Sequence, residues 1–303
     1  MPIDPLAGIL ARLVARLGAM DGEPRTLQGG MTNRNVCVSF AGTQVVVRLC
    51  GKRTAALGID RVTEELATRQ AARLGIGPAV VTRLQDEDVL VCVHLPGRPL
   101  TGEQLREPDR LVRVAGALRA FHESPSLPTR FAVVALCHRQ AAAAPAQAAD
   151  LNGVLALASR IDTALAGHRE HVPVPCHNDL LAANFIEHDG TLSLLDWEYA
   201  GMNDRFFDLA NLAANNELTP ADQQVLLDAY FGADGGATQR RRAALALMLI
   251  VSDLREALWG ITQRTLSDLD VDYGRYAGDH LARLRRRLAS GDIEEWITLA
   301  QTP

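Results

Sequence analysis

The segment His177-Asn178-Asp179-Leu180-Leu181-Ala182-Ala183-Asn184 constrains the fold of this chain more than any other part of its sequence. It lies in a half of the chain whose periodicity is mostly helical, and Asp196 follows Asn184 after twelve residues. The residues from Asn184 to Tyr199 include short apolar runs that are typical of strands. The fold must therefore hold a polar loop and a short β-like island within a helical region.

The residue types in this loop suit the transfer of a phosphoryl group to an alcohol. Such a transfer needs a carboxylate that orients the hydroxyl and accepts its proton, and oxygen ligands that hold Mg²⁺ against the phosphates. Asp179 can supply the carboxylate, while Asn184 and Asp196 offer the hard oxygen donors that Mg²⁺ prefers. The alternative interpretation is a polar loop with an asparagine turn and a capping aspartate. The combined spacing favours the phosphoryl-transfer site.

Residues 1–95 are predicted to form a small α+β unit. An amphipathic helix opens it, with apolar residues spaced from Leu6 to Leu17. Two alternating apolar runs on either side of Ala41-Gly42-Thr43 predict an antiparallel hairpin. A helix from about Asp60 to Leu74 follows. Two further strands, around residues 79–84 and 89–95, complete the unit.

The remainder of the chain, residues 96–303, is predicted to be mostly helical. A connector rich in proline and glycine, His94 to Pro99, precedes it. The predicted helices are 109–121, an alanine-rich stretch near 140–167, 220–231, 239–265 and 273–288. The order of a small sheet unit, a connector and a helical region predicts two domains, 1–95 and 96–303.

The charge of the chain argues against a nucleic acid as the main partner. The formal net charge is −5 at pH 7 and the sequence pI is about 5.9, whereas proteins that bind a duplex carry a basic surplus. The basic runs Arg240-Arg241-Arg242 and Arg285-Arg286-Arg287 lie in helical sequence. We interpret both as solvated helix faces.

The sequence also predicts a cytoplasmic protein without membrane insertion. The first residues, MPIDPLAGIL, lack a basic leader, and the most apolar stretch, Ala243 to Val251, is about half the length of a membrane span. The chain has five cysteines, and they are scattered without a CxxC pair. Such cysteines indicate reduced thiols rather than disulfides or a zinc site. Nothing in the sequence indicates the oligomeric state.

The motif His177 to Asn184, with the downstream Asp196-Trp197-Glu198, resembles the phosphotransferase family of choline, ethanolamine and aminoglycoside kinases, which are relatives of the protein kinases. The resemblance implies an α+β, two-lobed, protein-kinase-like fold in which residues 1–95 form a nucleotide-binding lobe and 96–303 a catalytic and acceptor-binding lobe. It implies ATP and Mg²⁺ as cofactors, Asp179 as the catalytic base, and Asn184 and Asp196 as Mg²⁺ ligands. Glu198 would order the metal ions or their waters.

The resemblance also assigns residues to the nucleotide phosphates. The segment Gly29-Gly30-Met31-Thr32-Asn33 lies where such kinases place a loop over the phosphates. Arg48, on the second strand of the predicted hairpin, would contact the phosphates, because arginine can bind phosphate oxygens bidentately. An acid from the following helix should pair with it. Glu64 fits the spacing best, and Glu65 is the alternative.

The aromatic residues of the second half resemble the cation box of choline and ethanolamine kinases. By position, Tyr199, Trp259 and Tyr276 match wall residues of that box, and aromatic faces attract ammonium groups. The chain departs from choline kinases at Glu256, where a second tryptophan is usual, and at Asn215, where an acid is usual. Replacing an aromatic wall by a carboxylate favours an amine with N–H donors over a trimethylammonium group.

These residues favour one function and leave others open. We expect an ATP- and Mg²⁺-dependent kinase that phosphorylates the hydroxyl of a small amino alcohol such as choline or ethanolamine, with Asp179, Tyr199, Glu256, Trp259 and Tyr276 contacting the acceptor. The same fold could instead act on an aminoglycoside, a sugar or a thiamine-like alcohol. A nucleotide-binding pseudokinase or regulatory module is the alternative of another class.

Overall fold

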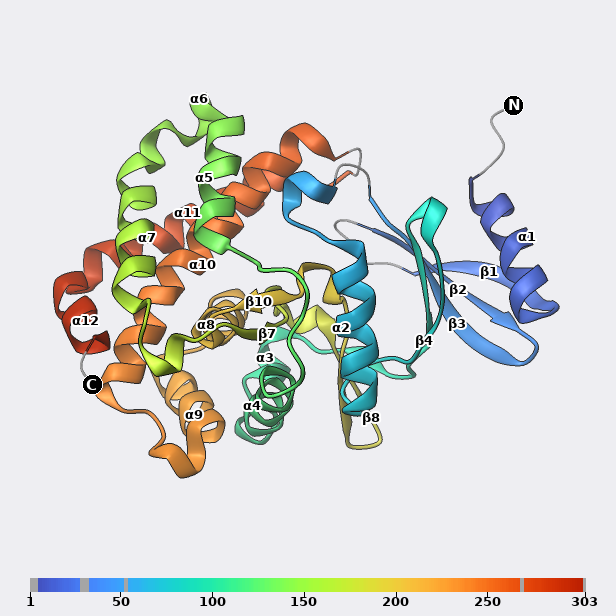
Figure 1. Ribbon diagram of the computed structural model, residues 1–303, viewed down its shortest axis with the longest axis horizontal. Coiled ribbons are helices and arrows are strands. Elements are labelled where there is room, and N and C mark those ends of the chain that lie inside the picture. The colour runs from blue at the N-terminus through green and yellow to red at the C-terminus, as the bar shows by residue number, and fades with distance from the viewer. Residues whose placement is uncertain (1–4, 28–32, 52–53, 268–269, 302–303) are drawn as a thin grey trace.

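The computed structural model describes residues 5–27, 33–51, 54–267 and 270–301. Figure 1 shows a β-sheet at one end of the molecule, a larger helical part at the other, and helix α2 (Arg61–Arg73) between them. The sheet is five-stranded with the order β1-β2-β3-β5-β4, and its neighbouring strands are antiparallel. Its strands are β1 (Met20–Leu27), β2 (Arg34–Phe40), β3 (Thr43–Leu49), β4 (Val80–Leu84) and β5 (Val89–Val93).

Alternation along the strands gives this sheet two different faces. One face carries Val45, Val47 and Val91, which are buried in a small core against Ile9 and Leu13 of helix α1 (Pro5–Leu17). The intervening residues of β3 and β5 turn to the opposite face, toward the helical part of the molecule. One face of the sheet is therefore buried in its own core, and the other is available to line a cleft against the helical part.

Strand β1 is an addition to the four strands expected from the sequence. It pairs with β2 at the edge of the sheet, and its register shifts between Asp21 and Arg25. Gly22 and Pro24 lie within this shift, and glycine and proline are tolerated in strands mainly at such edges and bulges. Because most of β1 is exposed, it lacks the apolar alternation that identified the other strands.

The helical part is built around α10, whose middle is buried on all sides. Its largest contacts are with α8, α11 and α12, and its apolar residues belong to one continuous core. The helices of this part are α3 (Gly102–Leu105), α4 (Pro108–His122), α5 (Val133–Ala143), α6 (Pro145–Ala148), α7 (Asn152–Leu165), α8 (Arg205–Asn215), α9 (Pro220–Phe231), α10 (Gln239–Leu266), α11 (Tyr273–Ser290) and α12 (Ile293–Ala300).

Two small sheets interrupt the helices. Strand β8 (Phe185–His188) pairs with β9 (Thr191–Leu194) and with β6 (Arg98–Pro99). Strand β7 (Val174–Cys176) pairs with β10 (Gly201–Asn203). Strands β8 and β9 lie in the β-like island predicted from the sequence, whereas β6, β7 and β10 lie outside it. The polar segment 177–184 connects β7 to β8, so both of its ends are fixed by strands.

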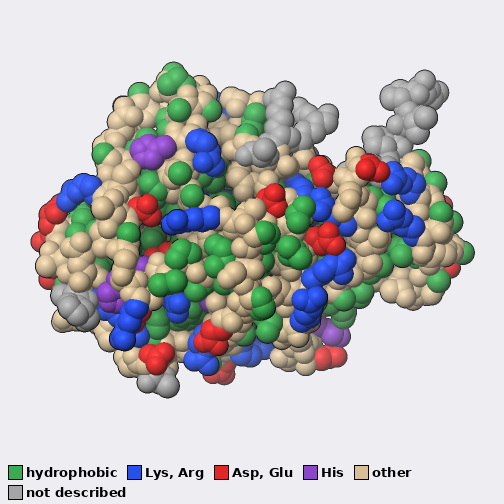
Figure 2. Space-filling model, viewed as in Figure 1, with side chains coloured by type: hydrophobic (Ala, Val, Ile, Leu, Met, Phe, Trp, Pro, Cys, Tyr) green, Lys and Arg blue, Asp and Glu red, His purple; other side chains and the backbone are tan. Residues whose placement is uncertain are grey.

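The predicted fold class, an α+β kinase-like fold with a small antiparallel sheet and a larger helical part, is confirmed. The division of the chain at residues 95 and 96 stays a prediction. No helix within the described residues is both long enough and apolar enough to cross a bilayer. On the face shown in Figure 2, acidic and basic side chains are interspersed over the sheet and the helices.

One sequence interpretation is wrong in part. Arg241 is not on a solvated helix face, because its side chain is buried and bonded to Glu170 through Nη2 at 2.8 Å. Arg240 also pairs with Glu170, at 2.7 Å. The basic run at the start of α10 therefore anchors this helix to the segment before β7.

Candidate active site

The loop 177–184 is held in shape by a polar stripe on helix α8. Both carboxylate oxygens of Asp208 accept backbone hydrogen bonds, from the N–H of His177 at 2.8 Å and of Asn178 at 2.7 Å. These contacts fix Asn178 in a left-handed conformation, with φ 66°. Asp208 is fully buried, so its carboxylate holds the loop rather than facing the site.

Two asparagines extend this stripe. Oδ1 of Asn211 accepts a hydrogen bond from the N–H of Leu180 at 2.6 Å, and Oδ1 of Asn216 accepts one from the N–H of Ala182 at 2.8 Å. The Asn216 amide also donates to the carbonyl of Leu180 at 2.9 Å. Four backbone N–H groups of the loop, those of His177, Asn178, Leu180 and Ala182, are thus satisfied by side chains of α8 and its C-cap.

His177 joins the loop to the end of strand β9. Its Nδ1 accepts a hydrogen bond from the N–H of Asp179 at 3.2 Å, so Nε2 carries the proton and donates to the carbonyl of Leu195 at 2.9 Å. Burial lowers the pKa of His177, which is consistent with a neutral ring. This hydrogen bond ties the loop to Leu195, the residue before Asp196.

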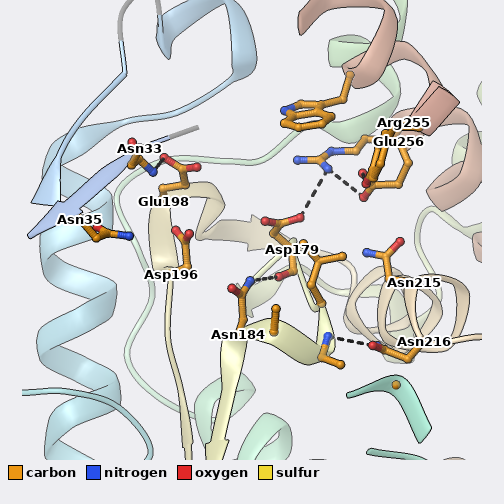
Figure 3. Close-up of a pocket in the computed structure, with 16 residues that line it drawn as sticks. Asn33, Asn35, Asp179, Asn184, Asp196, Glu198, Asn215, Asn216, Arg255 and Glu256 are labelled. Carbon is orange, nitrogen blue, oxygen red and sulfur yellow. Dashed lines mark hydrogen bonds and ion pairs between the residues drawn. The ribbon is translucent and has the colours of Figure 1, made fainter. Parts of the chain in front are cut away.

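Asn184 and Asp196 are brought together by the β8–β9 hairpin. The N–H of Leu195 donates to the carbonyl of Asn184 at 2.8 Å. Asp196 follows β9 with φ 64°, and its side chain is 31% exposed, so its carboxylate remains accessible at the site. Figure 3 shows both side chains beside Asp179, on the side that faces the sheet.

Arg48 reaches this pair from strand β3, where it lies on the face of the sheet opposite Val45 and Val47. Its Nη1 lies 3.1 Å from Oε1 of Glu64, and its Nη2 contacts the carboxylate of Asp196. The expected ion pair with Glu64 is therefore present. Glu65, the alternative partner, instead pairs with Arg69 at 2.8 Å.

Glu198 lies behind Asp196 and has three polar partners. Its Oε2 accepts a hydrogen bond from the side-chain amide of Asn33 at 2.9 Å, and lies 3.2 Å from Arg61 and 3.4 Å from Arg48. Burial raises the pKa of Glu198, and the nearby charge of Asp196 raises it further, while the two arginines oppose this shift. Arg61 has no counterpart among the site residues expected from the sequence. Gly29, Gly30 and Thr32 lie outside the described residues.

Two cavities meet at Asn184 and Asp196. The first, of about 380 Å³, lies between the sheet and the helical part. Its walls include the apolar side chains of Val46, Leu90 and Cys92 from the sheet and Ile186 and Leu195 from the other side. Arg48 also lines it, as does the connector around Leu95. A cleft that combines apolar walls with a cation suits a nucleotide.

The second cavity, of about 350 Å³, is lined mainly by polar and charged residues. Most of the residues expected at the site from the sequence line it, as do Arg255 and Asn215, both drawn in Figure 3. The expected residues are Asn33, Asp179, Asn184, Asp196, Glu198, Glu256, Trp259 and Tyr276. The structure thus brings together groups that lie far apart in the sequence.

The aromatic wall of this cavity is held by hydrogen bonds. The indole N–H of Trp259 donates to the hydroxyl of Tyr199 at 2.7 Å, and the hydroxyl of Tyr276 donates to Oε2 of Glu256 at 2.8 Å. The rings of Trp259 and Tyr276 meet edge to face, with centroids 5.3 Å apart. Tyr199 is fully buried behind Trp259 and does not line the cavity.

Arg255 is the main residue at this site that the sequence analysis missed. Its Nη1 lies 2.8 Å from Oε1 of Glu256 and 3.6 Å from Oδ1 of Asp179. Burial raises the pKa of Glu256, but the charges of Arg255 and His280 and the hydrogen bonds from Tyr276 and Asn211 together lower it overall. For Asp179, burial raises the pKa, Arg255 opposes that shift, and Glu256 and Asp196 add to it. The only sequence signal was one arginine beside Glu256 in an apolar helix.

The five-stranded sheet faces the loop 177–184 across the cleft. This arrangement is typical of kinase-like phosphotransferases. The chain belongs to the phosphotransferase enzyme family, whose model matches residues 23–245. This match covers both the sheet and the loop with Asp179 and Asp196. The resemblance inferred from the sequence is therefore confirmed at the level of the family.

Several known proteins are similar to this chain. Human ethanolamine kinase 2 is 30% identical over 286 residues, which cover 82% of this chain and 71% of that protein. Protein LicA of Haemophilus influenzae is 28% identical over 210 residues, and the match spans 67% of this chain but only 61% of LicA. A crystal structure of a choline/ethanolamine kinase family protein from Mesorhizobium loti is 26% identical, with a TM-score of 0.81 over 98% of this chain and 99% of that one. The chain is a phosphotransferase that resembles choline and ethanolamine kinases.

Proposed function

We propose that this protein is an ATP- and Mg²⁺-dependent kinase that phosphorylates the hydroxyl group of a small amino alcohol of the choline or ethanolamine type. The observation that carries the proposal is the position of Asp179, whose carboxylate faces the polar cavity beside the junction with the nucleotide-sized cleft. A phosphate donor in one cavity and an alcohol in the other would meet at this carboxylate.

The proposed reaction exchanges one oxygen–phosphorus bond for another. The acceptor oxygen forms a bond to the γ-phosphorus of ATP while the bond from that phosphorus to the β,γ-bridging oxygen breaks, and ADP leaves with the electron pair. The hydroxyl proton passes to the carboxylate of Asp179. Arg48 would contact the phosphates, and its bonds to Glu64 and Asp196 support this assignment because they hold the guanidinium at the mouth of the cleft.

The side chains at the junction fit Mg²⁺. The amide nitrogen of Asn184 is used by the carbonyl of Asp179, so its Oδ1 is the atom that remains for a metal. The Asp196 carboxylate is partly exposed beside it, and amide and carboxylate oxygens are suitable Mg²⁺ ligands. When bound, Mg²⁺ would neutralise the phosphate charge that develops during transfer. Glu198 lies behind Asp196 and is held by its hydrogen bond to Asn33 and by its ion pairs. In this position it would order the metal ions or their waters.

The acceptor is proposed from the second cavity. Its volume of about 350 Å³ lies within the range of ligand pockets, and two aromatic rings form part of its wall. The rings of Trp259 and Tyr276 can attract an ammonium group. The similarity to ethanolamine kinase 2 supports the same acceptor class. A cytoplasmic location is part of this proposal and rests on the sequence alone.

A screen of ATP turnover tests the proposal. The acceptors are choline, ethanolamine, their mono- and dimethylated intermediates and a set of aminoglycosides, each assayed for ADP release and for the phosphorylated product. We expect turnover with the amino alcohols and a preference for amines that carry N–H donors. Turnover restricted to aminoglycosides would show that the acceptor is an aminoglycoside and would contradict the proposed amino alcohol. Nucleotide binding without turnover of any alcohol would favour the pseudokinase.

A further inference from the structure

Arg255 is a buried cation that contacts the proposed base. It lies on α10 with only 1% of its side chain exposed, and its guanidinium carbon is 4.5 Å from the centroid of the Tyr199 ring. Nη1 is the atom that reaches the site, 2.8 Å from Glu256 and 3.6 Å from Asp179. Figure 3 shows this atom between the two carboxylates.

Arg255 differs from a buried arginine that only stabilises the fold. Arg241, on the same helix, uses all of its guanidinium nitrogens: Nε and Nη2 bond to Glu170, and Nη1 bonds to the carbonyls of Asp234 and Gly236. Nε and Nη2 of Arg255, in contrast, have no hydrogen-bond partner among the described residues. Burying a guanidinium with unpaired donors is costly, so a contribution to stability alone does not account for Arg255.

Asp179 needs a cation that its own loop does not contain. The segment 177–184 has no arginine or lysine, and the pKa of His177 is lowered by burial. Three other carboxylates, those of Asp196, Glu198 and Glu256, line the same cavity. Like charges at close range disfavour an ionised base. Arg255 supplies the opposite charge from a helix that is distant in the sequence.

We propose that Arg255 is a positioning residue for the base: its Nη1 holds Oδ1 of Asp179 and so directs Oδ2 toward the acceptor hydroxyl. This inference rests on the proposed function, because it takes Asp179 as the base. Arg255 is itself fixed by Glu256, whose Oε1 also accepts from Asn211 at 2.9 Å and whose Oε2 accepts from Tyr276. The anchor of the base is therefore part of the rigid helical wall of the cavity.

Chemical rescue of a truncated variant tests this inference. Arg255→Ala removes the guanidinium, and we expect kcat to fall roughly 10²-fold with little change in the KM for ATP, since a misplaced base costs about this much. Guanidinium chloride at millimolar concentration should restore part of kcat in a saturable manner. Urea, a neutral molecule of similar shape, should not. A role in folding alone predicts no response to either compound.

Arg241→Ala is the matched control, because Arg241 lies on the same helix and is buried and paired but does not line the cavity. The Arg241→Ala variant should have a lower melting temperature than the wild type but the same kcat. Guanidinium should not change its kcat, as it does not change that of the wild type. The double variant Arg255→Ala/Asp179→Asn should not be rescued, because the carboxylate is missing. Rescue of the double variant would show that guanidinium acts elsewhere and would overturn the inference.

Arg255→Lys keeps the inference testable if the alanine variant does not fold. Lysine retains the charge but cannot reproduce the planar group, so we expect a kcat below the wild type at an unchanged melting temperature. Wild-type kcat in either variant would overturn the inference. The comparison uses whichever alcohol the wild type phosphorylates, so an unexpected acceptor would contradict the proposed substrate and leave the test of Arg255 intact.

Discussion

The side-chain amide nitrogen of Asn184 donates a hydrogen bond to the main-chain oxygen of Asp179 at 2.9 Å. The two residues are five positions apart, and this bond closes the loop on itself. It also fixes the orientation of the Asn184 amide, because only the nitrogen can donate. Oδ1 is thereby turned toward Asp196 and the junction of the two cavities.

The first prediction concerns Mg²⁺ at this junction. Asp196→Ala should weaken Mg²⁺·ATP binding more than Asn184→Ala, because it removes an anionic ligand rather than a neutral one. Titration of turnover with Mg²⁺ measures this, and excess Mg²⁺ should partly restore Asn184→Ala. If both variants kept the Mg²⁺ dependence of the wild type, neither residue would be a metal ligand.

The second prediction concerns the base. Asp179→Asn preserves the shape of the side chain but removes the proton acceptor, so kcat should fall by roughly 10²–10⁴-fold. ATP affinity, measured by calorimetry or fluorescence, should change little, since Asp179 lines the polar cavity and not the apolar cleft. A variant that retained more than about a tenth of the rate would contradict the assignment.

The third prediction separates acceptor binding from packing. A cation over an aromatic face gains roughly 0.5–2 kcal/mol, so Trp259→Ala should raise the acceptor KM by about 2- to 30-fold and leave the KM for ATP nearly unchanged. Trp296→Ala is the matched control, because Trp296 packs on the same core but does not line the cavity. If both variants lost stability and the acceptor KM did not change, Trp259 would contribute to core packing and not to acceptor binding.

The fourth prediction concerns acid stability. Burial opposes ionisation of Glu170, but the hydrogen bonds from Arg241 and Arg240 and the charges of both arginines together lower the pKa to about 2. Because the folded-state pKa lies below the ordinary value of 4.5, this carboxylate stabilises the fold above about pH 4.5, and the stabilisation is lost as the pH falls toward 2.

Glu170→Gln measures this contribution. At neutral pH it should lower the free energy of unfolding by roughly 1.5–3 kcal/mol, the range for hydrogen bonds to charged groups. Denaturant titrations should show the difference from the wild type shrinking between about pH 4.5 and pH 2. A difference that stayed constant over this range would mean that the ion pair is not the source of the stabilisation.

Elements whose signals lie in neighbouring residues could be predicted from the sequence. Helix α9 begins and ends where expected, at Pro220 and Phe231. Thr219 caps it by accepting from the N–H of Asp222, and Asp222 accepts in return from the N–H of Thr219. The hairpin of β2 and β3 likewise follows from alternation around a turn. Such features depend on local chemistry that is visible in a few residues.

Features that depend on distant partners could not be predicted in the same way. Arg241 and Arg255 look alike in the sequence, each an arginine in a helical run, yet one anchors α10 and the other faces Asp179. Their difference comes from Glu170 and from the loop 177–184, which lie far from α10 in the sequence. The loop and its Asp179 were found because their spacing is itself informative, whereas a single arginine has no such pattern.

The attachment of the loop to helix α8 has a consequence for how the enzyme can be inhibited. The amide protons of His177, Asn178, Leu180 and Ala182 all point to side chains of α8 or its C-cap, so they can exchange with deuterium only when the loop separates from the buried helix. These amides should exchange slowly with or without nucleotide. The loop then has the same conformation before and after nucleotide binds. An inhibitor that requires a different conformation of this loop would therefore bind poorly.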